Sequence, residues 1–384
     1  MTCPEDYSLL QDVLELLAAD RFNGLGEAVR RLLNEAMRLE RQNHLGVGPY
    51  ERSEARQGYA NGFKPKTVQT RLGELEFSVP QVRDGGFYPS SLEKGLRSER
   101  ALKLALAEMY VQGVSTRKVA QITEKLCGFE VTSSQVSRAA QELDSVLDQW
   151  RNRPLGAYPY VYLDARYEKV RSNGAVVDMA VLVAIGVSDT GMRQILGTSV
   201  ALSEQEAHWR DFLRHLQGRK LHGVKLFISD AHEGLKSARK AVFPSIPWQR
   251  CQFHLQQNAQ AYVPKQEMKK SVAADIRSIF NAPTEIEAKR LLDQLLERYE
   301  KSAPRLVAWA EKNIPEGLVV FLFPSEHWRR IRTSNVLERI NREIRRRTRV
   351  ATIFPNDASC LRLISAVLME ISEEWETGRI YLTM

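Results

Sequence analysis

Apolar residues recur every three to four positions in residues 7–41. This spacing is typical of amphipathic helices, and Gly24 and Gly26 are expected to separate two of them. Residues 46–95 break the pattern with eight glycines, four prolines and short segments in which apolar and polar residues alternate. The alternation predicts a β-containing connector after the helical start.

Helical spacing returns in residues 99–150, together with signals for helix starts. Ser115 can cap one helix, and Thr132-Ser-Ser-Gln135 has the form of a capping box that begins the next. A glycine turn at residues 127–129 joins them, which matches a helix-turn-helix pattern. Its reading helix would carry Ser134, Gln135 and Arg138. The same pattern is common in helical proteins at large, so DNA binding by this unit is one of two interpretations.

The middle of the chain alternates between apolar runs and helical segments. The expected strands are residues 158–164, 176–187, 192–201, 224–229 and 246–250. The expected helices run from a capping box at residues 203–206 to about 217, over 233–242, and from about 252. This order is that of a ribonuclease H-like core, an α/β fold with a mixed five-stranded sheet. Residues 265–312 are purely helical in pattern, and residues 318–323 form a short apolar segment before an arginine-rich helix.

Two of the expected strands end on a carboxylate. Asp164 ends the run that begins at Ala157, and Asp230 ends the run that begins at Val224. Either aspartate alone is better explained as a turn former or a helix cap. Together, at strand ends that face the ligand-binding edge of an α/β sheet, they predict a metal site.

A third acid, Glu338, lies in the basic stretch from Arg332 to Arg349. If this stretch is an α-helix, Glu338 shares one polar and basic face with Asn335, Arg342, Arg345 and Arg349. The opposite face is apolar and is expected to pack on the sheet, with Leu337, Ile340 and Ile344. Glu343, the competing candidate, is turned about 140° away from Glu338. An intrahelical ion pair is the alternative explanation of Glu338.

The chain has 384 residues, enough for two or three domains, with 55 Lys+Arg against 47 Asp+Glu and a net charge of +8. The excess is concentrated in residues 329–349, which hold nine arginines against two acids. A polyanion such as nucleic acid fits this charge, and a solvated helix face is the alternative.

Cysteine usage and hydropathy bear on the compartment. The four cysteines are scattered without a Cys-x-x-Cys pair, so we expect no disulfide framework and a reducing cytosol. The N-terminus lacks the basic and apolar regions of a signal peptide, and no stretch approaches the roughly 18 apolar residues of a membrane helix. The sequence therefore predicts a soluble intracellular protein.

Phosphoryl transfer is the chemistry that best fits carboxylates among basic residues. The attacking oxygen must lose a proton and the leaving oxygen must have its charge neutralised, and two Mg²⁺ ions held by carboxylates perform both tasks. Mn²⁺ is an alternative, since such hard cations prefer oxygen ligands. These residues suggest a metal-dependent enzyme that cuts and joins nucleic acid.

The segment Trp248-Gln-Arg-Cys-Gln-Phe-His254 follows Asp230. Cys251 and His254 have the spacing of zinc ligands, but no second pair follows at zinc-finger spacing, so a structural zinc is not expected. His254 could orient a phosphate or a water near the carboxylates, or it is a hydrogen-bonded histidine on a packed helix. His232 has the same two interpretations.

Four segments give the chain a specific resemblance. They are Tyr-Leu-Asp-Ala-Arg-Tyr around Asp164, Ile-Ser-Asp-Ala-His-Glu-Gly-Leu around Asp230, Trp-Gln-Arg-Cys-Gln-Phe-His, and Thr-Ser-Asn-Val-Leu-Glu-Arg-Ile-Asn-Arg-Glu-Ile-Arg-Arg-Arg-Thr around Glu338. In these segments the chain resembles the prokaryotic Mutator-type transposases, the insertion sequence 256 branch of the DDE superfamily. An alanine follows Asp230 where that family more often has glycine, but the carboxylate and His232 are both present.

The resemblance implies that Asp164, Asp230 and Glu338 form a catalytic triad that binds the two Mg²⁺ ions. It also implies that Cys251 and His254 are the family's Cys-x-x-His motif. DNA phosphates are expected to be held by Arg339, Arg342, Arg345 and Arg346. The expected domains are an N-terminal helical and β-containing DNA-binding region (1–98), a helix-turn-helix-like domain (99–153), the first part of the core (154–260), an all-helical insertion (261–324) and the C-terminal core helices (325–384).

The implied function is that of an insertion-sequence transposase in the prokaryotic cytoplasm, associated with the nucleoid. The region before about residue 153 would bind terminal inverted repeats, and the core would cleave the DNA and transfer its strands to target DNA. Because two element ends must meet, a homodimer is expected. The alternatives are a ribonuclease H-fold nuclease or resolvase without strand transfer, and a non-catalytic DNA-binding regulator.

Overall fold

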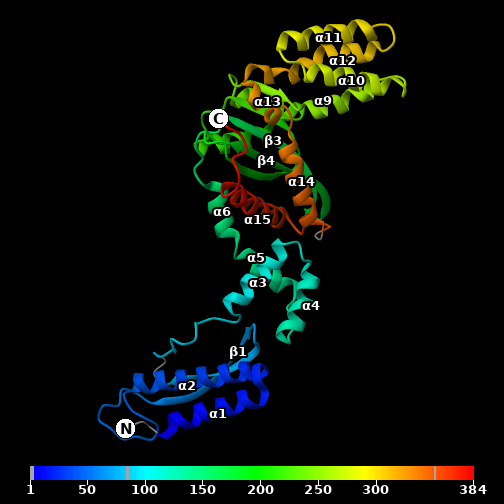
Figure 1. Cartoon of the computed structure of the whole chain (residues 1–384). Coiled ribbons are helices and arrows are strands. Elements are labelled where there is room, and N and C mark those ends of the chain that lie inside the picture. The colour runs from blue at the N-terminus through cyan, green and yellow to red at the C-terminus, as the bar shows by residue number, and fades with distance from the viewer. Residues whose placement is uncertain (1–3, 84–85, 350–351) are drawn as a thin grey trace. The chain divides into compact units, whose positions relative to one another are not determined.

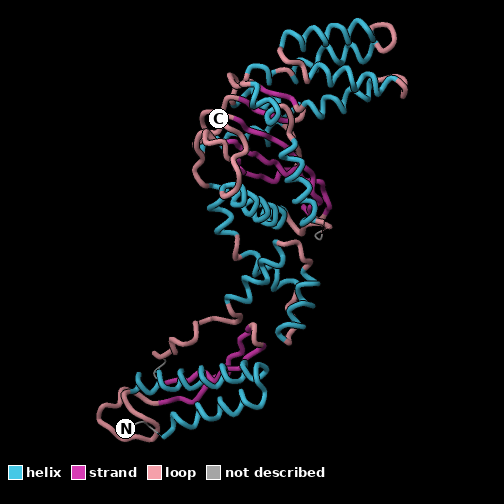
Figure 2. Tube along the Cα trace, in the orientation of Figure 1, coloured by secondary structure: helices cyan, strands magenta, loops and turns pink. Residues whose placement is uncertain are grey.

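The computed structural model describes residues 4–83, 86–349 and 352–384, and the chain divides into two compact units, Met1–Glu142 and Leu143–Met384. Helices predominate in both units, and the larger sheet belongs to the second (Figure 2). Each unit has its own buried core.

The first unit begins with two helices and a β-hairpin. Its elements are α1 (Pro4–Asp20), α2 (Leu25–Leu45), β1 (Ala60–Thr70) and β2 (Gly73–Val82). Met37 of α2 is fully buried with Leu75 and Phe77 of β2. The predicted helical start and β-containing connector are therefore confirmed.

The sequence predicted that Gly26 would help to separate the two helices, and this prediction is wrong. It lies in the first turn of α2, after a single 3-10 turn (Arg21–Gly24). A Cβ on Gly26 would lie 3.0 Å from the carbonyl oxygen of Leu72, so glycine here lets the helix approach the hairpin turn.

Three short helices complete the first unit, α3 (Arg100–Val111), α4 (Thr116–Cys127) and α5 (Ser133–Gln141). Both predicted helix starts are confirmed, because Ser115 caps α4 and Thr132 forms a capping box with Gln135. The side chain of Gln135 also donates to Oε1 of Gln69 on β1 at 3.2 Å. Ser134 and Arg138 are exposed, whereas the Gln135 amide is engaged inside the unit.

The second unit is built on one five-stranded mixed sheet in the order β5-β4-β3-β6-β7. Figure 1 labels β3 and β4 of this sheet, with α14 and α15 beside them. The strands are β3 (Tyr160–Ser172), β4 (Ala175–Val187), β5 (Arg193–Ala201), β6 (Leu226–Ser229) and β7 (Trp248–Arg250). β3, β4 and β5 pair antiparallel, whereas β6 runs parallel to both β3 and β7. The predicted α/β class with a mixed five-stranded sheet is confirmed.

The prediction that the first of these strands ends at Asp164 is wrong. β3 continues to Ser172 because β4 pairs with it along its whole length. The two strands are joined by Asn173 and Gly174, both with positive φ, and Asn-Gly is a strong hairpin signal that was overlooked. Asp164 therefore lies inside a long strand.

Helices cover both faces of the sheet. α7 (Glu206–Gly218) and α8 (Glu233–Val242) share a buried core with Val161 and Leu163 of β3. Side chains alternate along a strand, so Tyr162 and Asp164 point to the opposite face. That face meets α13 (Ser325–Ile331), α14 (Asn335–Thr348) and α15 (Asp357–Glu376). α6 (Asp144–Asn152) packs against α15.

α7 begins later than predicted. The capping box expected at residues 203–206 is not formed, since Gln205 is the N-cap residue and has no side-chain cap. The hydroxyl of Ser203 instead accepts a hydrogen bond from the backbone N–H of Gln205, a local turn that competes with helix capping.

A helical block follows the last strand. It consists of α9 (Gln252–Ala259), α10 (Met268–Phe280), α11 (Glu285–Tyr299) and α12 (Pro304–Asn313), which bury a common core around Ile276, Leu295 and Leu306. The predicted helical character of residues 265–312 is confirmed. The short apolar segment at 318–323 forms a 3-10 turn (Val319–Leu322).

Charge is divided unequally between the units. Residues 1–142 hold 19 Lys+Arg and 19 Asp+Glu, whereas residues 143–384 hold 36 and 28. The whole net positive charge of the chain therefore belongs to the second unit. None of the described helices combines the length and the apolar character that crossing a bilayer requires.

Candidate active site

Asp164 and Asp230 occupy equivalent positions on neighbouring strands. The parallel ladder between β3 and β6 ends at the pair Leu163 and Ser229, so Asp164 is the next residue of β3 and Asp230 is the first residue after β6. Neighbouring strands lie about 4.8 Å apart, so the chain at the two aspartates lies side by side, close enough for the charge of Asp230 to act on Asp164. β3 continues past this point while β6 stops, which leaves the ladder open beside Asp164.

The carboxylate of Asp164 is held by two hydrogen bonds. Oδ2 accepts from Nδ2 of Asn341 on α14 at 2.7 Å, and Oδ1 accepts from the backbone N–H of Ala165 at 2.9 Å. Burial raises the pKa of Asp164 to about 6, because it disfavours the charged form more than these bonds favour it. The nearby charge of Asp230 raises this pKa further, and His254 lowers it.

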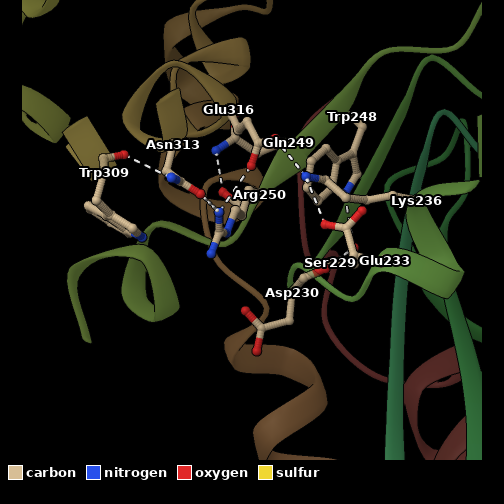
Figure 3. A network of polar contacts seen from close by, with 10 residues as sticks. All are labelled: Ser229, Asp230, Glu233, Lys236, Trp248, Gln249, Arg250, Trp309, Asn313 and Glu316. Atoms are coloured by element: carbon tan, nitrogen blue, oxygen red, sulfur yellow. Dashed lines mark hydrogen bonds and ion pairs between the residues drawn. The ribbon is translucent and has the colours of Figure 1, made fainter. Parts of the chain in front are cut away.

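Asp230 is paired with His254. Nδ1 of His254 on α9 lies 3.1 Å from Oδ1 of Asp230. Interactions with Asp230 first, and with Cys251 second, raise the pKa of His254 to about 10, so the imidazole is positively charged at neutral pH. Figure 3 shows Asp230 next to a polar network around Arg250 and Glu316, with no contact between its carboxylate and that network. His254 is therefore held by Asp230 on a packed helix, and whether it also orients a phosphate or a water stays a prediction.

Cys251 connects this site to the beginning of α14. It is buried at the N-cap of α9, and its Sγ accepts a hydrogen bond from the backbone N–H of Ser334 at 3.4 Å. Burial raises the pKa of the thiol, but hydrogen bonds from His254 and Ser334 outweigh it and the net shift is downward. The Cys-x-x-His segment thus contacts the strand end that carries Asp230 and the helix that carries Glu338.

Glu338 lies in the first turn of α14 and is half-buried. Leu337, Ile340 and Ile344 are buried, which confirms the predicted apolar face. In the described part of the chain the Glu338 carboxylate forms neither a hydrogen bond nor an ion pair, so the intrahelical ion pair considered from the sequence is absent there. Asn341, one turn later on the same helix, contacts Asp164.

Glu343 has a different environment. It forms ion pairs with Arg346 at 2.7 Å and Arg347 at 2.8 Å. Hydrogen bonds from these two arginines, first from Arg346, lower the pKa of Glu343 to about 2 although burial opposes the shift. Glu343 is engaged within its own helix, whereas Glu338 is not, and this difference favours Glu338 as the third acid.

The remaining predicted residues are dispersed. Arg339, Arg342, Arg345 and Arg346 are all exposed on α14, but Arg346 is paired with Glu343. His232 precedes α8, and its Nδ1 lies 3.9 Å from Oε2 of Glu204. No group of three or more His, Cys, Asp and Glu side chains within residues 4–83, 86–349 and 352–384 is arranged to hold a metal ion. The structure brings Asp164 and Asp230 together with His254, and the assignment of all three acids as metal ligands stays a prediction.

Asn341 and Arg166 are site residues that sequence reasoning missed. Nη1 of Arg166 donates to the backbone carbonyl of Asn341 at 2.5 Å, and its guanidinium pairs with Glu168 at 2.5 Å. Arg166 thereby ties α14 to β3 beside Asp164. Asn341 lies three residues after Glu338 on the polar helix face, which was the available signal for its role.

Comparisons with known proteins identify the family of the chain. The family model described as "Transposase, Mutator family" matches residues 5–378. The transposase for insertion sequence element IS406 of Burkholderia multivorans is 59% identical over 375 residues, covering 97% of each chain. The transposase for insertion sequence element IS256 in transposon Tn4001 of Staphylococcus aureus is 37% identical over 374 residues, covering 96% of this chain and 93% of the relative.

Among solved structures, a chain of the simian T-cell lymphotropic virus intasome in complex with a PP2A regulatory subunit aligns with 47% of this chain and 67% of its own length. Its TM-score is 0.19 and its sequence identity 13%, values too low to support an inference about the fold. The family assignment rests on the match across almost the whole sequence. This chain belongs to the Mutator family of transposases.

Proposed function

We propose that this chain is the DNA transposase of an insertion sequence, with a metal-dependent site formed by Asp164, Asp230 and Glu338. The observation that carries the proposal is the position of the two aspartates at the end of the β3–β6 ladder, with an unpaired glutamate on the helix that covers the same face. The strand order, with β6 and β7 parallel to β3, supports a ribonuclease H-like core.

The chemical type of the three donors, all carboxylates, suits a hard divalent cation. Asp164, Asp230 and Glu338 would hold two Mg²⁺ ions, or Mn²⁺, through carboxylate oxygens. Bound there, such ions lower the pKa of an attacking water and neutralise charge on the leaving oxygen. Oδ1 of Asp230 is buried and accepts no hydrogen bond from the described residues, although it forms an ion pair with His254. Its lone pairs would therefore be available to a cation.

The residues around the acids would keep them in place during two successive displacements. In the first, water attacks a phosphorus at the element end, the P–O3′ bond breaks, and a 3′-hydroxyl is released. In the second, this hydroxyl loses its proton and attacks a target phosphodiester, whose own P–O3′ bond breaks. Asn341 fixes the orientation of Asp164, and His254 fixes that of Asp230.

The other parts of the chain would serve DNA binding and assembly. The chain would have the five domains expected from its sequence. They are residues 1–98, 99–153, 154–260, 261–324 and 325–384, and the first two would bind terminal inverted repeats. A homodimer would bring two element ends together, and the protein would act on DNA of the nucleoid in the cytoplasm. Exposed arginines of α14 would contact phosphates of donor and target DNA.

Replacing Asp164 with asparagine tests the catalytic proposal. Asp164→Asn should abolish Mg²⁺-dependent cleavage and strand transfer while leaving binding to the inverted repeats, because only a ligand charge is removed. Asp178→Asn is the matched control, since Asp178 is exposed on β4 and forms no ion pair in the described part of the chain. Cleavage retained by the Asp164 variant would sink the triad assignment.

The two alternative functions give different results in the same assay. A nuclease or resolvase would cut end-bearing DNA without joining it to a target. A non-catalytic regulator would bind DNA but would neither cut it nor bind Mn²⁺ at the three acids. Joined products that the unmodified chain forms and the Asp164 variant does not form would exclude both.

A further inference from the structure

Two arginines from separate elements stack on one tyrosine in the second unit. Arg193 begins β5, Arg330 lies on α13, and Tyr381 lies near the C-terminus. The Cζ atoms of the arginines lie 4.5 and 4.7 Å from the centroid of the Tyr381 ring. Arg193 also lies 4.2 Å from the ring centroid of Trp375 on α15. The aromatic rings thus hold two guanidinium groups in fixed positions.

A third arginine adds positive charge near this stacked pair. Arg339, the residue after Glu338 on α14, and Arg330 both interact electrostatically with Arg193, and both lower its pKa in addition to the larger effect of burial. In the described part of the chain none of the three guanidinium groups forms an ion pair with a carboxylate. The cluster therefore consists of repelling charges without a protein counter-charge, an arrangement that an anion would stabilise.

The cluster lies on the sheet face that carries the candidate active site. The hydroxyl of Tyr162 donates to the backbone carbonyl of Arg330 at 3.0 Å. Tyr162 and Asp164 point to the same face of β3 and are separated by two residues, about 6.6 Å along a strand. Arg339 is adjacent in sequence to Glu338. Arg193 pairs with Val187 of β4, which pairs with Tyr160 of β3, so the cluster lies level with Tyr160, about 13 Å along the strand from Asp164.

Anchoring of the C-terminal residues does not account for the cluster. The backbone N–H groups of Tyr381 and Leu382 already donate to the carbonyl of Gly191, and the ring of His327 is hydrogen-bonded to the carbonyl of Thr383. Arg330 and Arg339 are exposed, so their charged ends face solvent.

We propose that Arg193 and Arg330, stacked on Tyr381, form together with Arg339 an anion site that binds a backbone phosphate of the DNA on the sheet face that carries the candidate active site. The inference rests on the proposed function and adds a substrate-positioning site to it. Arginine suits this role because its planar guanidinium group donates two parallel hydrogen bonds to a phosphate while its face stacks on an aromatic ring. Phosphate binding of this kind positions the strand and does not depend on its sequence.

The test measures binding of the full-length chain to duplex DNA of arbitrary sequence, without divalent metal, over a series of salt concentrations. Arg330→Gln and Arg339→Gln should each weaken binding and should reduce the slope of log K against log salt by about 0.9 for each phosphate that is no longer neutralised. Arg290→Gln is the matched control, because it removes the same charge from an exposed ion pair with Glu287 on α11. Arg330→Lys should keep the slope and bind DNA with part of the original affinity.

Slopes for both glutamine variants that equal the slope of Arg290→Gln would overturn the anion site. Since Arg330 and Arg339 are exposed, these variants should keep the melting temperature, and a reduced slope at unchanged melting temperature excludes a merely structural role. The measurement needs no catalysis, so absence of cleavage in the unmodified chain would count against the proposed function alone. A normal Asp164→Asn result together with unchanged arginine slopes would count against the anion site alone.

Discussion

The carboxyl group of Asp164 loses hydration where α14 covers β3, and its pKa rises from the usual 3.8 to about 6. Between these two pH values the folded chain binds more protons at Asp164 than the unfolded chain does. The free energy of unfolding therefore falls as pH rises from about 4 to about 6 and stays low above it. At neutral pH the ionised carboxylate opposes folding by about 1–3 kcal/mol, a cost that a bound cation would offset.

Asp164→Asn should consequently stabilise the metal-free protein at pH 7. Asparagine keeps an acceptor for Asn341 and removes the buried charge, so the gain should be about 1–3 kcal/mol at pH 7 and should vanish near pH 4. Urea unfolding of the variant and of the unmodified chain, in the presence of a chelator at pH 4 and pH 7, measures this difference in the free energy of unfolding. Asp178→Asn should show no such pH-dependent gain. An Asp164 effect that is equal at both pH values would contradict burial as the cause.

Asn341 is expected to matter for catalysis because it fixes the Asp164 carboxylate at 2.7 Å. Partners that orient metal ligands typically change activity or metal affinity by about 10–100-fold when removed. Asn341→Ala should lower the cleavage rate by that factor and raise the Mg²⁺ concentration needed for half-maximal rate. Asn335→Ala, at an exposed position of the same helix, is the control. Equal rates for the two variants would show that Asn341 has no positioning role.

The sequence identified acids more readily than their partners. Asp164, Asp230 and Glu338 were singled out because an acid after an apolar run, and helix spacing, can be recognised from local patterns, although β3 continues past Asp164. Whether Asn341 reaches Asp164 depends on how α14 lies on β3, and no local pattern specifies that contact. The same holds for the hydrogen bond between Cys251 and Ser334, which joins residues far apart in the chain.

At the scale of elements, helix and strand types were predictable where one periodicity extended over the whole element. α8 begins at Glu233 and ends at Val242, as its spacing predicted. The end of β3 was not predictable from its own residues, because after Asp164 the strand becomes polar and its length is set by pairing with β4. The start of α7 was missed because Ser203 uses its hydroxyl in a turn.

Gly191 connects the β4–β5 turn to the C-terminal residues, and its substitution tests that connection. Its φ is +80°, and a Cβ would lie 1.8 Å from the carbonyl oxygen of Leu382. Gly191→Ala should therefore displace residues 380–382, lower the free energy of unfolding and expose this segment to proteases. Gly174→Ala is the control, since Gly174 has φ +83° but nothing within 4 Å of its Cβ position.

The control variant should be destabilised only by the cost of a left-handed backbone, about 1–2 kcal/mol. Limited proteolysis followed by mass measurement of the C-terminal fragments distinguishes the two glycines. If both variants resist proteolysis equally, the backbone hydrogen bonds to Gly191 do not hold the C-terminal residues.

At the scale of the whole molecule, two compact units with separate cores imply two unfolding transitions. Met37 is fully buried in the first unit, and Met37→Ala should cost about 2–5 kcal/mol. In differential scanning calorimetry of the full chain this variant should lower one transition and leave the other unchanged. Ile276→Ala, in the core of the helical block, should affect the other transition. One transition that shifts in both variants would mean that the units unfold together.

The division of charge between the units has a consequence for how such a protein would find its sites. Net positive charge attracts any DNA, and all of it lies in the unit that holds the carboxylates. The first unit has as many acids as bases, so under the proposed function it would recognise element ends by local contacts and gain little from bulk attraction. The two binding tasks would then depend on salt differently. Binding of target DNA by the second unit would be independent of sequence and weakened by salt, whereas binding of an element end by the first unit would be less sensitive to salt.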